Sequence, residues 1–231
     1  MLLGTSGDNA PGEVIDKAAR RLRLHNRPDL ANCSGGYAIQ TVGKNGDPHR
    51  FQFKETLLHE RSCNFSFSSH RTKFEKKIVE LDSEDLLDDE TVVSDFCASV
   101  EFSIGYVMTR RLLRAIEFLN RKELWGNDNC KPKSIAVSGG VACNQRIRSM
   151  INHACKLSDC EAVFPPPQYC TDNGVMIAWN GVEKWRKNAD LIPWNRVFDV
   201  DVQPRVPFGL NRIQDVIDAN IPNRKIKFDD L

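Results

Sequence analysis

The residues best suited to chemistry in this 231-residue chain lie in a glycine turn between an expected strand and an expected helix. Residues 134–137 form a short run with β-branched side chains, and Ser138-Gly139-Gly140 leads from it into an amphipathic stretch. Glycines in such a turn let backbone amides approach a ligand, and the unpaired N–H groups at a helix start suit phosphate. A Gly-Gly turn also serves simply to close a tight connection. Phosphate binding and plain turn geometry therefore both remain open.

A second block, residues 164–178, brings a carboxylate to the start of another expected helix. Its three consecutive prolines carry the chain out of a strand, because proline continues neither a helix nor a central strand. Thr171, Asp172 and Asn173 then offer side-chain oxygens to cap the helix that follows. Asp172 either caps this helix or lies at its N-terminus, free to bind a metal or contact a phosphate. Local chemistry leaves both alternatives open.

A third block near the start of the chain predicts a helix with its own carboxylate. Asp8 or Asn9 can cap this helix, and Pro11 fits one of its first positions. Asp16 and Arg20 have the i,i+4 spacing of a solvated ion pair, which stabilises a helix by about 0.3 kcal/mol. Such a pair is the ordinary interpretation of Asp16.

The elements that position these blocks indicate an α/β fold. Apolar residues repeat at helical spacing from 100 to 119, which predicts a buried core helix. From there to about Lys187 the order is helix, strand, glycine turn, helix, strand, helix, which is typical of crossover units on a sheet. We also expect short strands at residues 50–53 and 65–67. From residue 193 onward we expect an extended tail that packs on the body.

Composition sets further limits. The chain is 41% hydrophobic, enough to fill a core, and its net charge of +1 gives no overall basic field for nucleic acid. No apolar run approaches the roughly 20 residues that span a bilayer. The eight cysteines contain no Cys-x-x-Cys pair, which argues against a zinc ribbon and favours reduced thiols.

Together the three blocks resemble one family, the tRNA N6-adenosine threonylcarbamoyltransferases, or TsaD family. The resemblance covers nearly the whole chain, and it lies mainly in residues 8–17, 65–68, 138–148 and 170–178. The segment from Pro207 is most similar to the mitochondrial branch. The resemblance implies an actin-like ATPase (ribonuclease-H-like) fold, here its C-terminal portion only. It also implies transfer, in mitochondria, of a threonylcarbamoyl group from threonylcarbamoyl-AMP to N6 of the adenosine 3′ of a tRNA anticodon.

The resemblance also assigns substrate-binding roles. Asp16 matches a family aspartate at the nucleotide ribose, and Gly36 matches a glycine at the adenosine side. Gln40 stands where many members carry a glutamate or aspartate, and its amide still hydrogen-bonds a ribose hydroxyl but brings no charge. Asn144 matches the asparagine of the glycine turn, with Cys143 beside it.

The metal site is where this sequence departs from the family. Asp172 matches the metal-binding aspartate, with Thr171 beside it, and the implied cofactor is one divalent ion, iron or zinc. The other family ligands are a His-x-x-x-His pair, whereas no two of the five histidines here are four residues apart. Catalytic sites of this kind usually need about three protein ligands, so Asp172 alone cannot hold a metal tightly. Since Met1 matches a point well inside the family sequence, we expect an N-terminally truncated product, an alternative start or an incomplete gene model.

The resemblance implies that the chain has three parts. Residues 1–92 would be the remainder of the nucleotide-contacting region between lobes, residues 93–192 an α/β lobe with the glycine turn and metal aspartate, and residues 193–231 the tail.

The implied partners are tRNA, threonylcarbamoyl-AMP and a second copy of the chain as a homodimer; no general base can be assigned. The alternatives are a truncated non-catalytic or regulatory product, a metallopeptidase-like protein and a small-molecule kinase of the same fold.

Overall fold

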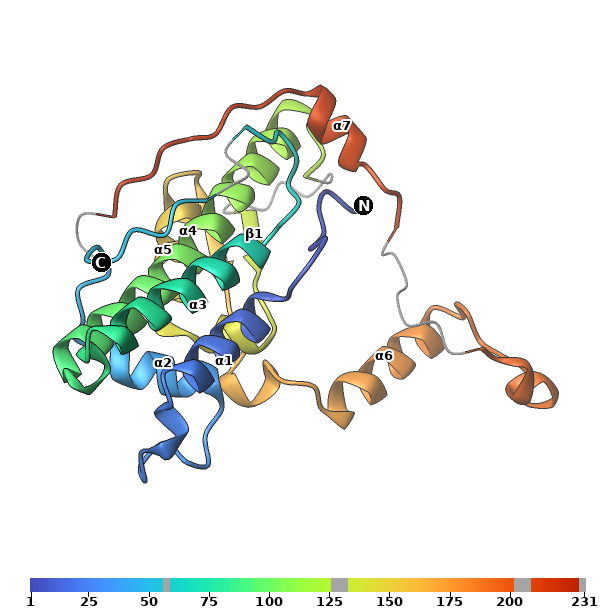
Figure 1. Cartoon of the computed structure of the whole chain (residues 1–231). Helices are drawn as coiled ribbons and strands as arrows, with labels where there is room; N and C mark the ends of the chain where they lie inside the picture. Colours follow the sequence, from blue (N-terminus) through green and yellow to red (C-terminus); the bar gives the residue numbers. More distant parts are fainter. Residues whose placement is uncertain (56–58, 126–132, 202–208, 229–231) are drawn as a thin grey trace.

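The computed structural model describes residues 1–55, 59–125, 133–201 and 209–228, and within them it is a mixed α/β arrangement (Figure 1). Short 3₁₀ helices join several of the longer elements. The helices and strands are α1 (Pro11–Arg21), α2 (Gly35–Gly43), α3 (Ser68–Ser83), α4 (Glu90–Arg121), β1 (Lys133–Ala136), α5 (Gln145–Lys156), β2 (Cys160–Val163), α6 (Gly174–Arg186) and α7 (Ile213–Asp218). The 3₁₀ helices are Leu24–Asn26, Leu86–Asp88, Gly140–Cys143, Pro167–Tyr169 and Trp194–Asp199.

Helix α4 is the centre of the core and confirms the helix expected over residues 100–119. It has 32 residues and packs against α2 and α5. Its start is set by Asp89, whose side chain accepts hydrogen bonds from the amides of Thr91 at 2.8 Å and Val92 at 3.2 Å. Residues 82–90, which are rich in carboxylates, therefore supply the cap of this helix through Asp89, and negative charge at this position is favoured by the positive end of the helix dipole.

The sheet is small and parallel. Strands β1 and β2 pair in register from Lys133 with Cys160 to Ala136 with Val163, and α5 forms the connection between them. This crossover confirms the expected order of helix, strand, turn, helix, strand and helix. Helix α5 packs against β2 and α4, and the 3₁₀ helix Gly140–Cys143 contacts α1, so both join the crossover unit to the core.

The strands expected at residues 50–53 and 65–67 are wrong. Phe51 and Phe53 instead insert their rings beside Phe96 of α4, with centroid separations of 5.5 and 5.6 Å. The Phe51 amide donates to the Ser99 hydroxyl at 3.2 Å, so the backbone here bonds to a helix side chain. Phe65 forms only an isolated bridge with Ser6 among the described residues. The alternating phenylalanines here insert their rings into a helical core. The sequence pattern that results resembles the alternation of a strand.

Helix α1 begins at Pro11 as expected, but Asp8 and Asn9 do not cap it. Its N-cap is Ala10, which offers no side-chain oxygen. Asp8 instead reaches the start of α3, where its carboxylate accepts from the amides of Phe67 at 2.9 Å and Ser68 at 3.3 Å. Burial opposes the change, but hydrogen bonds from the Ser66 hydroxyl and from these two amides lower the pKa of Asp8. Asp8 precedes α1 in the sequence, but its carboxylate therefore caps the N-terminus of α3.

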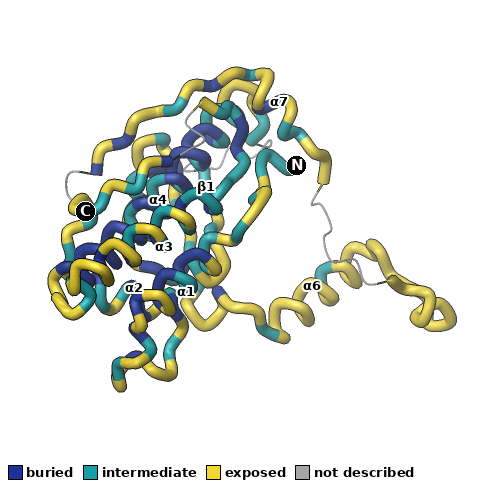
Figure 2. Tube along the Cα trace, viewed as in Figure 1, coloured by how far each residue is buried: buried dark blue, intermediate teal, exposed yellow. Residues whose placement is uncertain are grey.

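The segment around α6 extends away from this body (Figure 1). Every residue of α6 is exposed or intermediate, and the tube through it is exposed along nearly its whole length (Figure 2). The chain then returns over the body, where Val216, Ile221, Ile226 and Phe228 are buried. None of the helices in the described residues is both long and apolar enough to cross a membrane.

Candidate functional site

Two residues expected to contact a nucleotide, Asp16 and Gly36, meet where α1 crosses α2. The Asp16 Oδ1 atom accepts a hydrogen bond from the Gly36 amide at 3.1 Å. In the described part of the chain, no ion pair joins Asp16 to Arg20, so the ordinary interpretation of Asp16 is wrong. The approach is close because Gly35 has no side chain: a Cβ there would lie 2.5 Å from Asp16 Oδ1. Asp16 thus stabilises the N-terminus of α2 through one of its two carboxylate oxygens.

Gln40, one turn further along α2, faces the start of α5. Its Oε1 atom accepts a hydrogen bond from the Gln145 amide at 2.7 Å. A neutral amide here supplies the acceptor that a helix N-terminus needs, without placing a charge there. This bond is one of the links that hold α2 against α5 beside the candidate site.

Asn144 caps α5 and is almost completely buried, with 7% of its surface exposed. Its Oδ1 atom accepts from the Ile147 amide at 3.0 Å, and its Nδ2 group donates to Glu101 Oε1. Both ends of this side chain are therefore engaged within the protein. One N–H and one lone pair remain for any further partner.

Glu101 is a site residue that the sequence did not reveal. It lies on α4 with 1% of its surface exposed, and it also accepts from Arg146 Nε at 3.2 Å. Burial raises the pKa of Glu101, while the Asn144 hydrogen bond and the Arg146 charge oppose that shift. Arg146 donates in addition to the carbonyl of Gly43 at 3.0 Å. Buried charged residues recur along α4, Asp95 among them, so no signal in the sequence singled out Glu101.

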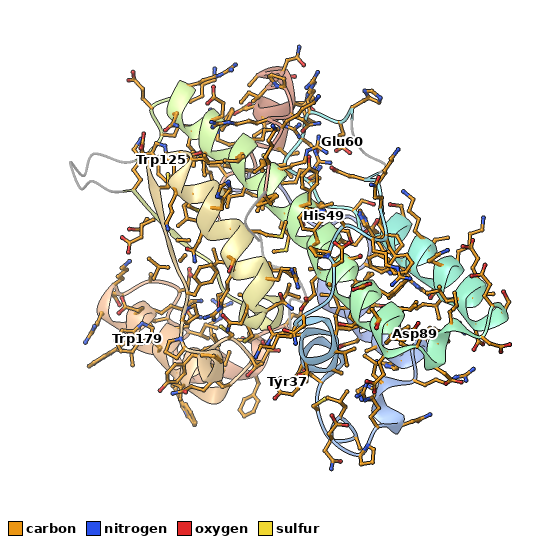
Figure 3. The ribbon with its side chains drawn as sticks, turned by 90° about the vertical axis from the view of Figure 1, so that its left-hand side faces the viewer. Tyr37, His49, Glu60, Asp89, Trp125 and Trp179 are labelled. Atoms are coloured by element: carbon orange, nitrogen blue, oxygen red, sulfur yellow. The ribbon has the colours of Figure 1, made fainter. Side chains whose placement is uncertain are left out.

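An open pocket of about 570 Å³ lies between α2, α4 and α5, over these contacts. Tyr37 is labelled at α2 in Figure 3 and has 57% of its surface exposed. The pocket combines this aromatic ring with two cations, the carboxyl group of Glu101 and several neutral polar groups. Its lining residues are Tyr37, Gln40, Thr41, Lys44, Glu101, Gln145, Arg146 and Ser149.

The glycine turn takes a shape that needs glycine at one position. Gly139 has φ +102°, a value that other residues rarely adopt. A 3₁₀ helix, Gly140–Cys143, follows before α5 begins at Gln145. Gln40 and Asn144 already accept hydrogen bonds from two amides at the start of α5, so the N-terminus of α5 is largely capped by the protein itself.

The remaining expected site residues lie at the edge of the body. Asn173 caps α6 by accepting from the Met176 amide at 3.1 Å, so the suggestion that Asp172 is this cap is wrong. Asp172 and Thr171 are exposed. The Cys143 thiol lies 3.8 Å from the Pro167 carbonyl, which brings the glycine turn next to the segment leading to Asp172.

A metal site is not formed by these residues alone. Within residues 1–55, 59–125, 133–201 and 209–228, no three His, Cys, Asp or Glu side chains are placed to hold a metal ion. Asp172 is a single exposed carboxylate, and about three protein ligands are usual in a catalytic centre. The donor set therefore does not fit a resident metal without further ligands.

Comparison with known proteins identifies a consistent set of relatives. The family model described as "TsaD: tRNA N6-adenosine threonylcarbamoyltransferase" matches residues 1–179. The chain is 33% identical over 232 residues to the human "tRNA N6-adenosine threonylcarbamoyltransferase, mitochondrial", covering 99% of this chain and 55% of that protein. It is 37% identical over 195 residues to a Xenopus tropicalis protein of the same description, covering 83% and 47%. It is 33% identical over 194 residues to the Rickettsia canadensis "tRNA N6-adenosine threonylcarbamoyltransferase", covering 84% and 52%. The chain spans about half the length of the curated relatives it matches.

Proposed function

Because this chain belongs to the tRNA N6-adenosine threonylcarbamoyltransferase (TsaD) family, we propose that it takes part in the modification of tRNA in mitochondria. The reaction would move a threonylcarbamoyl group from threonylcarbamoyl-AMP to N6 of the adenosine 3′ of the anticodon. The observation that carries the proposal is the pocket between α2, α4 and α5, which Gln40 lines and beside which Asp16 contacts Gly36.

The chemistry of the pocket suits an adenylate. The exposed Tyr37 ring offers a face on which a purine can stack, and Lys44 and Arg146 offer positive charge to a phosphate. Glu101 holds the Arg146 guanidinium from behind, so this cation is positioned before the ligand arrives. The second oxygen of Asp16 and the amide of Gln40 would receive the ribose hydroxyls.

The proposed reaction is an acyl transfer. The N6 amine attacks the carbamoyl carbon, a C–N bond forms, and the C–O bond to the phosphate breaks. AMP leaves with the electron pair of that bond, and N6 loses one proton. The residues described here bind and orient the adenylate; no step is routed through a metal, since Asp172 does not complete a metal site in this part of the chain.

Substitution of Gly36 tests the site without disturbing the fold. A Cβ at Gly36 would meet no atom within 4 Å, so Gly36→Ala should leave the free energy of unfolding unchanged or slightly raised. We expect the variant to bind threonylcarbamoyl-AMP and AMP at least tenfold more weakly in calorimetry, because the methyl group would occupy the adenosine side of the site.

The matched control is Gly7→Ala, at an exposed glycine whose Cβ would also meet nothing within 4 Å. This control should bind adenylate like the unaltered chain. Equal affinity in Gly36→Ala and Gly7→Ala would refute the assignment of the pocket. Release of ADP from ATP, in the absence of acylated tRNA, would support the kinase alternative.

A further inference from the structure

Two cysteine side chains meet where the glycine turn contacts the segment that leads to α6. The 3₁₀ helix that ends at Cys143 packs against the 3₁₀ helix that directly precedes Cys170. The Cys143 thiol donates to the Pro167 carbonyl at 3.8 Å, and the Cys170 thiol donates to the Pro165 carbonyl at 3.6 Å. Both sulphur atoms therefore lie against the same short proline segment, and neither cysteine lines the pocket proposed for the adenylate.

Arg148 of α5 holds the two cysteines in this arrangement. Its guanidinium donates to the carbonyl of Ala142, the residue before Cys143, and to the Pro165 carbonyl at 3.1 Å. The same guanidinium lies 3.8 Å from the Cys170 sulphur. One side chain therefore connects the backbone beside the first cysteine with the sulphur of the second.

The two sulphur atoms are close enough to interact directly. The Cys143 thiol lies within hydrogen-bonding reach of the Cys170 sulphur, and both side chains are free thiols. Cys170 is 3% exposed, whereas Cys143 is partly exposed, so solvent reaches the pair from the Cys143 side. An accessible thiol next to a second thiol is typical of a site where a sulfenic acid forms on one sulphur and is resolved by the other.

The ionisation of Cys143 sets the rate of such chemistry. Burial raises the pKa of this thiol, and the hydrogen bond to Cys170 raises it further, while the charge of Arg148 opposes both effects. Since the thiolate is the nucleophile, little of the reactive form is present at neutral pH. Oxidation is therefore slow at neutral pH and faster in alkaline buffer.

We propose that Cys143 and Cys170 form a disulfide when the chain meets a small hydroperoxide, which makes this pair a site of reversible oxidative modification. First the Cys143 thiolate attacks one hydroperoxide oxygen, the O–O bond breaks, and a sulfenic acid and an alcohol or water are produced. The Cys170 sulphur then attacks the Cys143 sulphur, the S–O bond breaks, and water leaves with the Cys170 proton. The two thiols lose two electrons and two protons, and the hydroperoxide takes up both.

The disulfide would attach the base of the α6 segment to the body. Cys170 shortly precedes Gly174, the first residue of α6, and from there the chain extends away from the body (Figure 1). A covalent bond between Cys170 and the glycine turn would anchor this segment at its start. The proposal is independent of the adenylate pocket and of the acyl transfer, because its product is a bond within this chain.

Peptide mapping tests the bond directly. The full chain, reduced and then freed of reductant, would be treated with excess hydrogen peroxide in alkaline buffer, alkylated and digested with trypsin. We expect the linked peptides that carry Cys143 and Cys170 to be roughly tenfold more abundant than any other linked pair, because proximity makes this step effectively unimolecular. Two thiols per chain should be lost, and dithiothreitol should restore both. The same treatment in denaturing urea should spread the disulfides over several cysteine pairs.

Variants separate the two steps. In Cys170→Ser the sulfenic acid on Cys143 has no resolving sulphur, so it should persist and be trapped by dimedone. Cys143→Ser should yield no loss of two thiols, because the remaining Cys170 is buried and has lost its partner. Cys33→Ser is the matched control, since Cys33 is also partly exposed and its thiol donates to the Leu30 carbonyl at 3.1 Å.

The control Cys33→Ser should give the same linked peptides as the unaltered chain. Three results would each overturn the proposal: a different dominant pair in the native chain, the same spread of disulfides in native and urea-unfolded chains, or no dimedone adduct on Cys143 in Cys170→Ser.

Discussion

At the scale of the residue, Asn144 shows how one side chain serves stability and the candidate site together. Asn144→Ala removes the cap of α5 and also leaves the buried Oε1 atom of Glu101 without its hydrogen-bond donor, while Arg146 still donates to Oε2. The expected loss in the free energy of unfolding is about 2–4 kcal/mol, the sum of a lost cap and an unsatisfied buried group. Urea unfolding measures it.

Asn173 provides the control, since it caps the exposed helix α6 in the same way. Asn173→Ala should cost about 1 kcal/mol or less, because no buried carboxylate depends on Asn173. Equal losses in the two variants would show that the bond to Glu101 contributes nothing. Where Asn144→Ala remains folded, we also expect weaker adenylate binding.

His70 makes the stability of the chain depend on pH. Its pKa falls from 6.5 to about 4 on folding, so between these values the unfolded chain binds a proton that the folded chain does not. Stability should therefore rise with pH from about 4 to 6.5, by up to about 3 kcal/mol, and then level off. Unfolding by urea across this pH range measures the slope.

The variant His70→Phe should lose this part of the pH dependence, whereas His59→Gln should keep it. Titrating carboxylates contribute in both variants and cancel in the difference between the two curves. Parallel curves for His70→Phe and the unaltered chain would contradict the buried, neutral state of the ring.

At the scale of the element, the crossing of α1 and α2 requires glycine at position 35 but not at position 36. A Cβ at Gly35 would lie 2.7 Å from Asp16 Cα, so Gly35→Ala must push the helices apart. We expect it to cost about 1–3 kcal/mol, which is typical of overpacking. Gly36→Ala meets open space and should change stability in the opposite direction, by about 0.5–1 kcal/mol.

Thermal unfolding of Gly35→Ala and Gly36→Ala distinguishes overpacking at position 35 from a general effect of replacing glycine. If both substitutions destabilise the chain equally, the close approach of α1 to α2 is not what requires glycine at position 35. If the account holds, the lower stability of Gly35→Ala should accompany weaker adenylate binding, because Asp16 would lose its contact with the Gly36 amide.

At the scale of the whole molecule, the body and the α6 segment differ in how their apolar residues are used. In α6, Ile177 and Trp185 are 75% and 70% exposed, while Ile147 of α5 is fully buried. Trp185→Ser should therefore change the free energy of unfolding of the dilute chain by less than about 0.5 kcal/mol, whereas Ile147→Ala should cost about 2–5 kcal/mol.

Exposed tryptophans also promote association, so sedimentation velocity should show less self-association in Trp185→Ser than in the unaltered chain. A loss of 2 kcal/mol or more in Trp185→Ser would mean that α6 packs on the body in solution. The expected homodimer stays a prediction that the same sedimentation experiment tests at low concentration.

The sequence alone determined the order of the elements around the glycine turn, the long core helix and the family. The order of the elements and the core helix follow from local rules, because apolar periodicity, turn residues and proline positions depend on neighbours in the chain. The family follows from the resemblance of particular motifs. The resemblance of residues 138–148 and 170–178 singled out Asn144 and Asp172 as candidate site residues, and their roles stay predictions. Where local rules failed, at residues 50–53, an alternating aromatic pattern suited a strand and a core insertion equally well.

Only the tertiary structure decided which partners the polar side chains have. Asp8 caps α3, Gln40 bonds to α5, and Glu101 links Asn144 to Arg146, and each of these contacts joins residues far apart in the chain. The same holds for His70, whose unpartnered ring follows from the phenylalanines around it. Hydrogen bonding and burial depend on what packing brings within about 3 Å, and a one-dimensional pattern does not contain that information.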